Sequence, residues 1–485
     1  MIIAGYSASN QGRVGPFVAT KEAQTPTEHP MHRELIARYD RPGPRYTSYP
    51  TANEFHTGIR ECDLRTALRL VPADGRLSLY LHVPFCEERC LYCACNVIAT
   101  KRREVAERYL EHLLQEIALA ADCLGAPARA VDQLHLGGGT PTYFTSAQLR
   151  RLVEAIRARF EIAVDAELAI EIDPRVTMPS QIETLQSLGF RRFSMGVQDF
   201  DPAVQEAIGR IQSVEQTEAV VRACRSVAGA SVNIDLIYGL PRQTLASFRR
   251  TLDEVIRIRP DRLAIYGFAF VPWLRKQQLQ MPVEEMPTTE ERLALLELAR
   301  ERLQEAGYVG IGIDHFALPD DELIVAQRDG RLSRNFMGYT VRRAPQLLAF
   351  GVSAISEFPS VYVQNTKKLS EYGAALEAGL LPVEKGVALS DDDDRRRWVI
   401  RELMCNFRVS AADFEAQFSG ASFASAFAHE LEELRCFAAG GFARWDGERL
   451  ELTPTGQFLA RNVAMLFDTH LRGSEATTHR FSRTV

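Results

Sequence analysis

The stretch YLHVPFCEERCLYCACN (80–96) places four cysteines within ten positions: Cys86, Cys90, Cys93 and Cys95. The first three follow a C-x3-C-x2-C spacing, directly after an apolar run (77–83) that predicts a buried strand. Three thiolates on a loop of this length suit three irons of a [4Fe–4S] cubane. The fourth iron would then lack a protein ligand, and an open metal position is where a substrate or cofactor binds.

Other interpretations of these cysteines stay open. Cys95 could be a fourth ligand, although the C-x-C spacing from Cys93 makes shared ligation of one cubane awkward. Four thiolates also suit zinc, but structural zinc sites prefer two well-separated C-x2-C pairs, and here all four lie in one loop. Disulfides are less expected, because nine cysteines in 485 residues are too sparse for a disulfide scaffold. No role is assigned to Cys62, Cys123, Cys224, Cys405 and Cys436.

Outward from this loop, strand and helix patterns alternate. Short apolar runs predict strands at 77–83, 133–137, 168–173, 191–197, 231–239 and 262–270. A stripe of apolar residues at every fourth position predicts a helix over 103–121. Six strand–helix units predict an α/β fold with a parallel sheet, curved into a partial (β/α)6 barrel rather than a closed eight-unit barrel.

Three local signals set the bounds of later helices. Ser180 with Glu183, and Ser213 with Gln216, are capping-box starts. Gly307 is expected to close a helix that begins near Thr289.

Composition shifts divide the chain into four segments. Residues 1–35 are expected to form a mobile leader. Residues 36–75 are rich in Pro and Tyr and are expected to form an arm that packs over the barrel. Residues 76–389 form the expected catalytic domain. The charge run SDDDDRRR (390–397) opens a small helical domain over 390–485, with a hairpin at 442–453 turned at Asp446-Gly447.

Bulk composition excludes several functional classes. A net charge of −6 gives no reason to expect nucleic acid binding. No run of about 18 apolar residues predicts a membrane span, and the N-terminus lacks the pattern of a signal peptide. A cytoplasmic location is therefore expected.

Several motifs in order resemble those of the oxygen-independent coproporphyrinogen III oxidases, a family of radical S-adenosylmethionine (SAM) enzymes. The matching segments are RYTSYPTA (45–52), CACN (93–96), GGGTPT (137–142), EIDPR (171–175), MGVQDF (195–200), GIDHFALPDDEL (312–323), RNFMGYT (334–340), FGVSAIS (350–356) and CNFR (405–408). The resemblance runs from about residue 36 to residue 472.

The resemblance implies a reaction of haem biosynthesis. Two propionates of coproporphyrinogen III leave as CO2, giving the vinyl groups of protoporphyrinogen IX, and 5′-deoxyadenosyl radicals from SAM start the chemistry. The implied cofactors are one [4Fe–4S] cluster and two SAM molecules. An electron donor such as flavodoxin or ferredoxin is expected, and the chain is expected to be a monomer.

The resemblance also implies site residues. Cys86, Cys90 and Cys93 would hold the cluster, Tyr92 would shield it, and Cys95 would lie nearby. Gly138, Gly139 and Thr140 end a strand, where the glycine backbone and the threonine hydroxyl and amide could bind the methionine part of SAM.

Further residues belong to the SAM pocket by family position. Glu171 and Tyr80 would touch the cluster-bound SAM; the second molecule would meet Gln198, Arg210, Asp235 and Ala269, and Ile355 would also lie in the pocket. Arg45, Lys101, Arg334 and Arg401 are possible partners of the propionates. His135 is expected in the core, whereas His82 and His315 are ambiguous.

Two other functions fit the same scaffold. One is a haem-binding chaperone, although such relatives lack the cysteine matching Cys95 and usually lack the RYTSYP arm. The other is a different radical SAM enzyme acting on tetrapyrroles, such as a methyltransferase or a haem-degrading enzyme.

Overall fold

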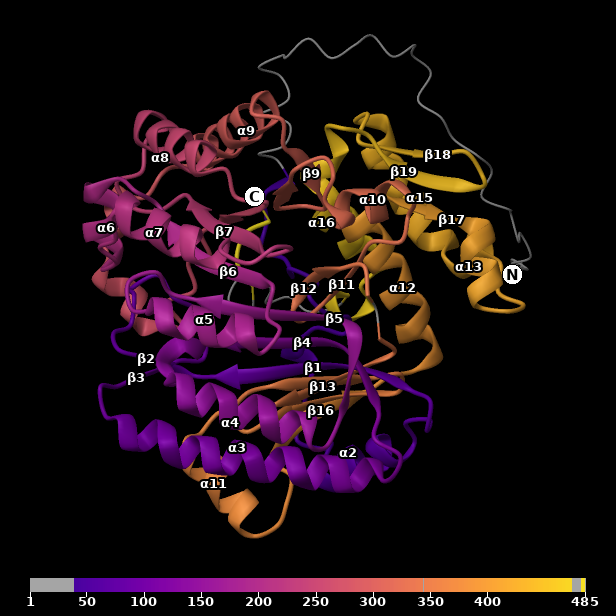
Figure 1. Cartoon of the computed structure of the whole chain (residues 1–485). Helices are drawn as coiled ribbons and strands as arrows, with labels where there is room; N and C mark the ends of the chain where they lie inside the picture. The colour runs from indigo at the N-terminus through magenta and orange to yellow at the C-terminus, as the bar shows by residue number, and fades with distance from the viewer. Residues whose placement is uncertain (1–38, 343, 473–480, 485) are drawn as a thin grey trace, which may run out of the picture.

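A computed structural model describes residues 39–342, 344–472 and 481–484 (Figure 1). The predicted leader, 1–35, lies outside these residues. Of the helices that the structure describes, none is long and apolar enough to cross a membrane.

Six parallel strands in chain order form the middle of one large sheet, as predicted. They are β1 (Arg76–Val83), β4 (Ala130–Gly138), β5 (Glu161–Ile172), β6 (Arg192–Gln198), β7 (Ser231–Tyr238) and β8 (Arg262–Gly267). Strand β5 begins at Glu161, before the apolar run that predicted it. The first half of the strand is exposed or only partly buried and therefore does not belong to that run. The partial (β/α)6 barrel is therefore confirmed.

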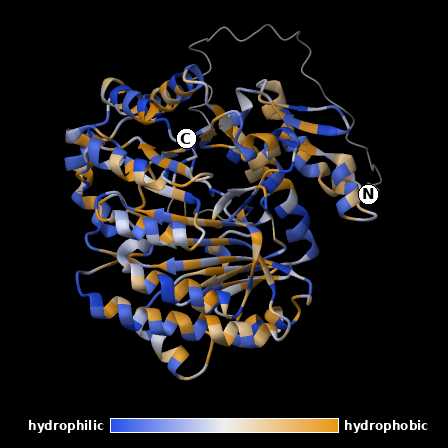
Figure 2. Ribbon diagram, viewed as in Figure 1, coloured by the Kyte–Doolittle hydropathy of each residue, from blue (hydrophilic) through white to orange (hydrophobic). Residues whose placement is uncertain are grey.

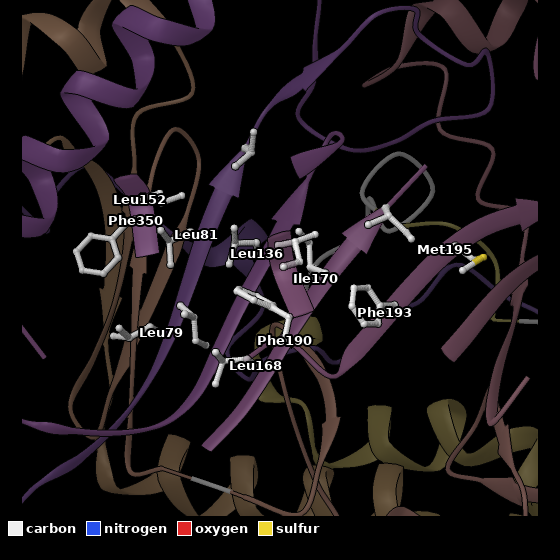
Figure 3. Close-up of a cluster of buried hydrophobic side chains, with 14 of the residues drawn as sticks. Leu79, Leu81, Leu136, Leu152, Leu168, Ile170, Phe190, Phe193, Met195 and Phe350 are labelled. Carbon is white, nitrogen blue, oxygen red and sulfur yellow. The ribbon is translucent and has the colours of Figure 1, made fainter. Parts of the chain in front are cut away.

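Side chains alternate between the two faces of these strands. One face carries the apolar residues that pack under the helices, among them Leu79, Leu136, Ile170 and Phe193, which are essentially inaccessible to solvent (Figure 3). The positions between them are largely polar; Tyr80 pairs in register with His135, and Glu171 with Ser194. Since successive strand residues point to opposite faces, the inner face is polar and can hold a ligand.

Helices between the strands cover the outer face of the sheet (Figure 1). They are α3 (Arg103–Leu124), α4 (Ser146–Arg157), α5 (Pro179–Ser187), α6 (Pro202–Ile208), α7 (Val214–Cys224), α8 (Leu245–Ile258) and α9 (Thr289–Glu305). Figure 2 shows hydrophobic residues concentrated in the central strands and mixed with hydrophilic residues along these helices. This amphipathic pattern lets each helix bury one side against the sheet.

Two of the three helix signals are confirmed. The Ser213 hydroxyl caps α7 by accepting from Gln216 N, and Gly307 follows the end of α9 with φ +87°. The start at Ser180 is wrong: α5 begins at Pro179 with Met178 as its N-cap. Pro179 fixes φ at the first position of the helix. The side chain that accepts a hydrogen bond from the N-cap amide, that of Met178, is Gln181 and not the expected Glu183.

The sheet extends at both edges with strands that the apolar runs do not predict. At one edge β13 (Gln346–Phe350) pairs parallel with β1 and leads to antiparallel β14 (Ile355–Phe358), β15 (Val361–Asn365) and β16 (Val383–Ala388). At the other edge β10 (His315–Ala317) pairs with β8 and β9 (Val309–Ile311). The smaller elements nearby are β2 (Phe85–Cys86), β3 (Ile98–Ala99), β11 (Ser333–Asn335), β12 (Gly338–Thr340), α10 (Glu322–Arg328) and α11 (Leu369–Glu377).

Beyond residue 390 the chain forms a helical unit with its own core. Its elements are α12 (Asp391–Asn406), β17 (Arg408–Ser410), α13 (Ala411–Gln417), α14 (Phe423–Ala426), α15 (Ala428–Ala439), β18 (Ala443–Trp445), β19 (Arg449–Leu452) and α16 (Ala460–Ala464). The predicted hairpin is present as β18–β19, with Gly447 at φ +98° in its turn. Short 3-10 helices occur at Ala52–Glu54, Pro141–Tyr143, Lys276–Gln280, Val283–Glu285, Gly456–Leu459, Met465–Phe467 and Thr469–Leu471.

The N-terminal arm contributes apolar residues both to the C-terminal unit and to the main core of the sheet. Tyr46 and Tyr49 are buried in the core of the C-terminal unit, and Phe55 stacks on Tyr362 of β15. Helix α2 (Glu61–Arg69) then packs beside α3. The arm therefore links the C-terminal unit to the sheet.

Candidate active site

A cavity of about 290 Å³ lies at the carboxyl ends of the parallel strands. Ligands of parallel α/β sheets gather at this end because the strand-to-helix loops converge there. The sequence-predicted site residues that line it are Cys86, Cys90, Tyr92, Cys93, Cys95, Gly138, Gly139, Thr140, Glu171, Gln198, Arg210, Asp235 and Ala269. The fold thus brings together residues spread over more than 180 positions.

The cysteine loop is held against the Gly-rich end of β4 by backbone hydrogen bonds. Gly139 N donates to Val83 O, and Thr140 N to Phe85 O, both at 2.8 Å. A Cβ on Gly139 would lie 2.7 Å from Phe85 O, so only glycine allows this approach. The Thr140 amide is therefore not free to bind a ligand, contrary to expectation, whereas its hydroxyl lies 3.5 Å from Cys86 Sγ.

The cysteine set fits a cubane better than a single metal ion. Within the described residues, no group of three His, Cys, Asp or Glu side chains is placed to hold one ion. Zinc ligands converge on one atom, whereas a cubane takes its three thiolates on three different irons and needs no such convergence. The thiol sulfur of Cys90 also accepts from Arg175 Nη2 and Arg210 Nη1, both at 3.6 Å, and these cations suit a negatively charged cluster.

The free thiols differ in their ease of ionisation. Burial raises the pKa of Cys86 to about 11. Hydrogen bonding from Cys95 lowers the pKa of Cys93. Cys95 therefore contacts one of the expected ligands directly, which places it beside the metal-binding loop.

Asp173 joins the two guanidiniums that reach Cys90. Its carboxylate accepts from Arg175 at 2.7 Å and from Arg210 at 3.1 and 3.2 Å. Burial by itself would raise the pKa of Asp173, but the Arg210 and Arg175 cations outweigh it and hold the pKa at about 2. Asp173 is thus an anion at any working pH, and it fixes both arginines.

Glu171, two residues before Asp173, binds the Gly-rich turn. It accepts from Gly138 N at 2.9 Å, and His135 Nε2 lies 3.5 Å from its other oxygen. Burial opposes ionisation, yet the bonds from His135 and Gly138 lower the pKa of Glu171. The carboxylate is therefore ionised and faces the cavity.

The far wall of the cavity comes from β6 and β7. Gln198 sits at a bulge with φ +70°, and Arg210 donates to Gly196 O. Burial raises the pKa of Asp235 to about 6, although Asn233 donates to it at 2.7 Å.

Two predicted pocket residues do not line the cavity. Tyr80 lies behind it, with its hydroxyl 3.0 Å from His82 Nδ1 and its ring stacked on His135. Ile355 packs in the cluster around Phe55 and Tyr362 instead. Sequence position alone could not place Ile355. It is the first residue of β14, and the direction of the β14–β15 hairpin depends on long-range pairing with the rest of the sheet.

The expected propionate partners are scattered. Arg45 lines the central cavity, whereas Lys101 forms an exposed ion pair with Glu88. Arg334, which lies 3.9 Å from Asp314, and Arg401 line one small cavity that is distinct from the central one. Asp314 also accepts from His315 at 2.7 Å, so that histidine has a partner in this structure.

Asp173 and Arg175 are site residues that the sequence patterns did not single out. They belong to the EIDPR motif (171–175), in which Asp173 directly follows β5 and stands two residues after Glu171, so an extended backbone puts both side chains on the same side. That two-residue spacing is the signal that could have found Asp173. Arg175 has no such signal, because it lies in the turn that follows.

Comparisons with known proteins give consistent matches. Residues 80–255 match the model of the Radical SAM superfamily. The chain is 44% identical to the oxygen-independent coproporphyrinogen III oxidase of Pseudomonas aeruginosa and 43% identical to that of Escherichia coli, in each case over 93% of this chain and 98% of the relative. A solved structure of the Escherichia coli coproporphyrinogen III oxidase, described as a radical SAM enzyme, superposes with a TM-score of 0.84 at 42% identity, covering 88% of this chain and 98% of the other.

Proposed function

The chain belongs to the family of oxygen-independent coproporphyrinogen III oxidases, and we propose that its central cavity converts coproporphyrinogen III to protoporphyrinogen IX. It is a radical SAM oxidoreductase of haem biosynthesis, with a [4Fe–4S] cluster and SAM as cofactors. The comparisons do not favour a haem-binding chaperone or another enzyme acting on tetrapyrroles.

Cys86, Cys90 and Cys93 are the proposed cluster ligands. The observation that carries this assignment is that the three thiols line one cavity, with two guanidiniums 3.6 Å from Cys90 Sγ. When bound, the cluster and SAM together supply the 5′-deoxyadenosyl radical that removes hydrogen from a substrate propionate. Cys95 contacts Cys93 and is not needed as a ligand in this proposal.

The proposed roles of the surrounding residues follow from their charges. Glu171, ionised and facing the cavity, would accept hydrogen bonds from an ammonium or ribose hydroxyl. Arg210 already binds the Asp173 carboxylate through Nη1 and Nη2, so its buried Nε–H, which has no partner in the described structure, is the donor left for a ligand. The aromatic ring of Tyr92 would exclude water from the cysteine loop.

Two SAM molecules per chain remain part of the proposal. Glu171 and Tyr80 would contact the cluster-bound molecule; Gln198, Arg210, Asp235 and Ala269 would contact the second. The support is that these residues, apart from Tyr80, line the cavity that holds the cysteines.

The proposed partners are coproporphyrinogen III and a small electron carrier such as flavodoxin or ferredoxin, acting on a monomer. We also propose a cytoplasmic location. Its support is that no disulfide joins any of the nine cysteines, all of which lie within the described residues, as expected in a reducing compartment.

An anaerobic assay tests the function. Protein reconstituted with iron and sulfide, then reduced, is mixed with SAM and coproporphyrinogen III, and the tetrapyrroles are separated by chromatography. Wild type should form protoporphyrinogen IX with release of two CO2. Cys90→Ser should lose both the cluster absorption and SAM cleavage, whereas the exposed Cys62→Ser control should keep both. Unchanged porphyrinogen together with tight haem binding would favour the chaperone instead.

A further inference from the structure

A second, smaller cavity adjoins the central one. Its volume is about 60 Å³, and it lies where α9, the N-terminal arm and the C-terminal unit meet. Arg45 and Gly267 line both cavities, so the two share a wall. Figure 1 shows α9 and α16 at the same upper end of the molecule.

Guanidinium groups dominate the lining of this cavity. Arg45 comes from the arm, Arg292 and Arg300 from α9, and Arg461 from α16. Arg483 also lines it but is paired with Asp40. We refer to the cavity formed by Arg45, Arg292, Arg300 and Arg461 as the arginine pocket.

The positive charge of the arginine pocket is not balanced by acidic lining residues. One carboxylate lines it, Asp314, and that group already accepts from His315 at 2.7 Å. Within the described residues, no ion pair links Asp314 or another carboxylate to Arg45, Arg292, Arg300 or Arg461. Partly buried, unpaired cations of this kind are costly unless an anion joins them.

Two of these arginines are held at the rim of the central cavity. Arg45 Nη2 donates to Gly267 O at 2.6 Å, and Arg292 Nη2 donates to Phe268 O at 3.3 Å. The Nε–H of Arg292 is buried and has no hydrogen-bond partner in the described structure. A donor is therefore available beside the strand end that lines the central cavity.

The other two arginines are positioned without carboxylates. Arg300 lies over the Phe458 ring, with Cζ 4.3 Å from the ring centre, and burial lowers its pKa. Arg461 donates to the carbonyls of Gly43, Pro44, Arg483 and Thr484. Burial, and to a smaller extent the charge of Arg45, lower the pKa of Arg461 to about 9, although Asp314 acts in the opposite direction.

We propose that the arginine pocket binds a propionate carboxylate of the tetrapyrrole substrate while another propionate lies in the central cavity. The inference rests on the proposed function and adds the residues that would recognise the substrate. Guanidinium forks match carboxylates in bidentate geometry, and the two cavities are adjacent at Arg45 and Gly267. A substrate fixed at one carboxylate presents its other side chains to the cluster in a limited set of orientations.

The test measures binding rather than turnover. Full-length, cluster-reconstituted protein is titrated anaerobically with coproporphyrin III, the stable oxidised form with four carboxylates, and with its tetramethyl ester. Arg300→Gln is the main variant, because its guanidinium donates no hydrogen bond within the described structure. Arg292→Gln is the second variant, and Arg300→Lys retains the charge. Arg302→Gln is the control on the same helix, since Arg302 pairs with Asp253 and Glu305 away from the pocket.

Each glutamine variant should weaken coproporphyrin III binding about tenfold or more, as expected for a lost bond to a charged group. Arg300→Lys should lose less, and Arg302→Gln should match wild type. Binding of the tetramethyl ester should be weak and equal in all variants. The SAM-induced change in the cluster spectrum should be unaltered.

Three results would overturn the proposal: wild-type affinity for coproporphyrin III in both glutamine variants, equal losses for the acid and the ester, or a loss of SAM binding instead. Failure of the proposed function is a separate result. In that case wild type would leave coproporphyrinogen III unchanged while the glutamine variants still weakened coproporphyrin III binding.

Discussion

At the residue scale, the end of β5 organises the site through two carboxylates. Glu171 accepts from the Gly138 amide, and Asp173 holds Arg175 and Arg210 beside Cys90. Both side chains reach the central cavity because they stand two residues apart along an extended backbone. One strand end therefore fixes the Gly-rich turn and the cations next to the cysteine loop.

Asp173→Asn should weaken SAM binding about tenfold without reducing iron content. The pKa of Asp173 is about 2, so its charge neutralises and orients Arg210 at any working pH. Losing a charge-assisted contact of this kind costs about 1.5–3 kcal/mol. SAM titrations monitored by the cluster spectrum measure the change. Asp165→Asn is the control on the same strand, since Asp165 forms an exposed pair with Arg342; equal behaviour of the two variants would contradict the role of Asp173.

We expect Asp235 to give SAM binding a pH dependence. Burial raises its pKa to about 6, so the group is ionised above pH 6 and protonated below. An ionised carboxylate accepts hydrogen bonds from a ligand, and therefore SAM affinity should fall as the pH drops from 7.5 to 5. Asp235→Asn should flatten this profile. Parallel profiles in wild type and variant would show that another group titrates.

The sequence predicted much of this site because its cysteines and strand-end residues carry strong local patterns. Cys86, Cys90 and Cys93 converge, as do Glu171 and Asp235. Of the arginine pocket, only Arg45 was among the expected propionate partners. Arg292, Arg300 and Arg461 had no such signal, because they lie more than 240 residues after Arg45 and a single arginine in a helix is more often a surface charge.

At the element scale, Glu116 fastens α3 to the added strands of the sheet. This buried carboxylate accepts from Gly351 N at 2.7 Å, from Asn365 Nδ2 at 2.6 Å and from the Tyr372 hydroxyl at 2.6 Å. Gly351 follows β13, Asn365 is the last residue of β15, and Tyr372 lies in α11. One helix residue thus fixes three elements that the apolar patterns left unassigned.

Glu116→Ala should lower the free energy of unfolding by about 3 kcal/mol, because three donors would be left buried without an acceptor. Urea unfolding followed by circular dichroism measures the loss. Glu111→Ala, on the same helix, removes an exposed pair with Arg151 and should change stability by no more than about 0.5 kcal/mol. A similar small change for Glu116→Ala would mean that the network is not stabilising.

The six parallel strands and the hairpin after Phe442 were predictable because their partners are near in sequence or follow a regular strand–helix repeat. The strands β13–β16 were not, because β13 pairs with β1 from about 270 residues away. Short strands with distant partners leave little periodic signal in the sequence.

At the scale of the whole molecule, the arm joins two separate cores. One core lies between the sheet and its helices, and the other belongs to the C-terminal unit. Tyr46 donates from the arm to Asp468 at 2.8 Å in the second core. Because Arg45 directly precedes Tyr46, docking of the arm also places the wall shared by the central cavity and the arginine pocket.

Tyr46→Phe should loosen the arm. The change leaves the buried Asp468 carboxylate without its hydroxyl donor and should cost about 1–3 kcal/mol. Limited trypsin digestion with mass spectrometry should show faster cleavage after Arg45, and the thermal midpoint should fall. Tyr143→Phe removes a hydroxyl bond to Thr100 far from the arm and should not speed that cleavage. An unchanged rate of cleavage in Tyr46→Phe would show that the Tyr46–Asp468 hydrogen bond does not hold the arm in place.

The proposed chemistry depends on a cluster held by Cys86, Cys90 and Cys93 with one iron left for SAM. The most direct test is electron–nuclear double resonance of the reduced, reconstituted protein with SAM labelled by 17O in its carboxylate and 15N in its amino group. We expect hyperfine coupling of both labels to the cluster, in wild type and in Cys95→Ser. A cluster spectrum that does not change when SAM is added, with Cys95 as a fourth sulfur ligand, would contradict it.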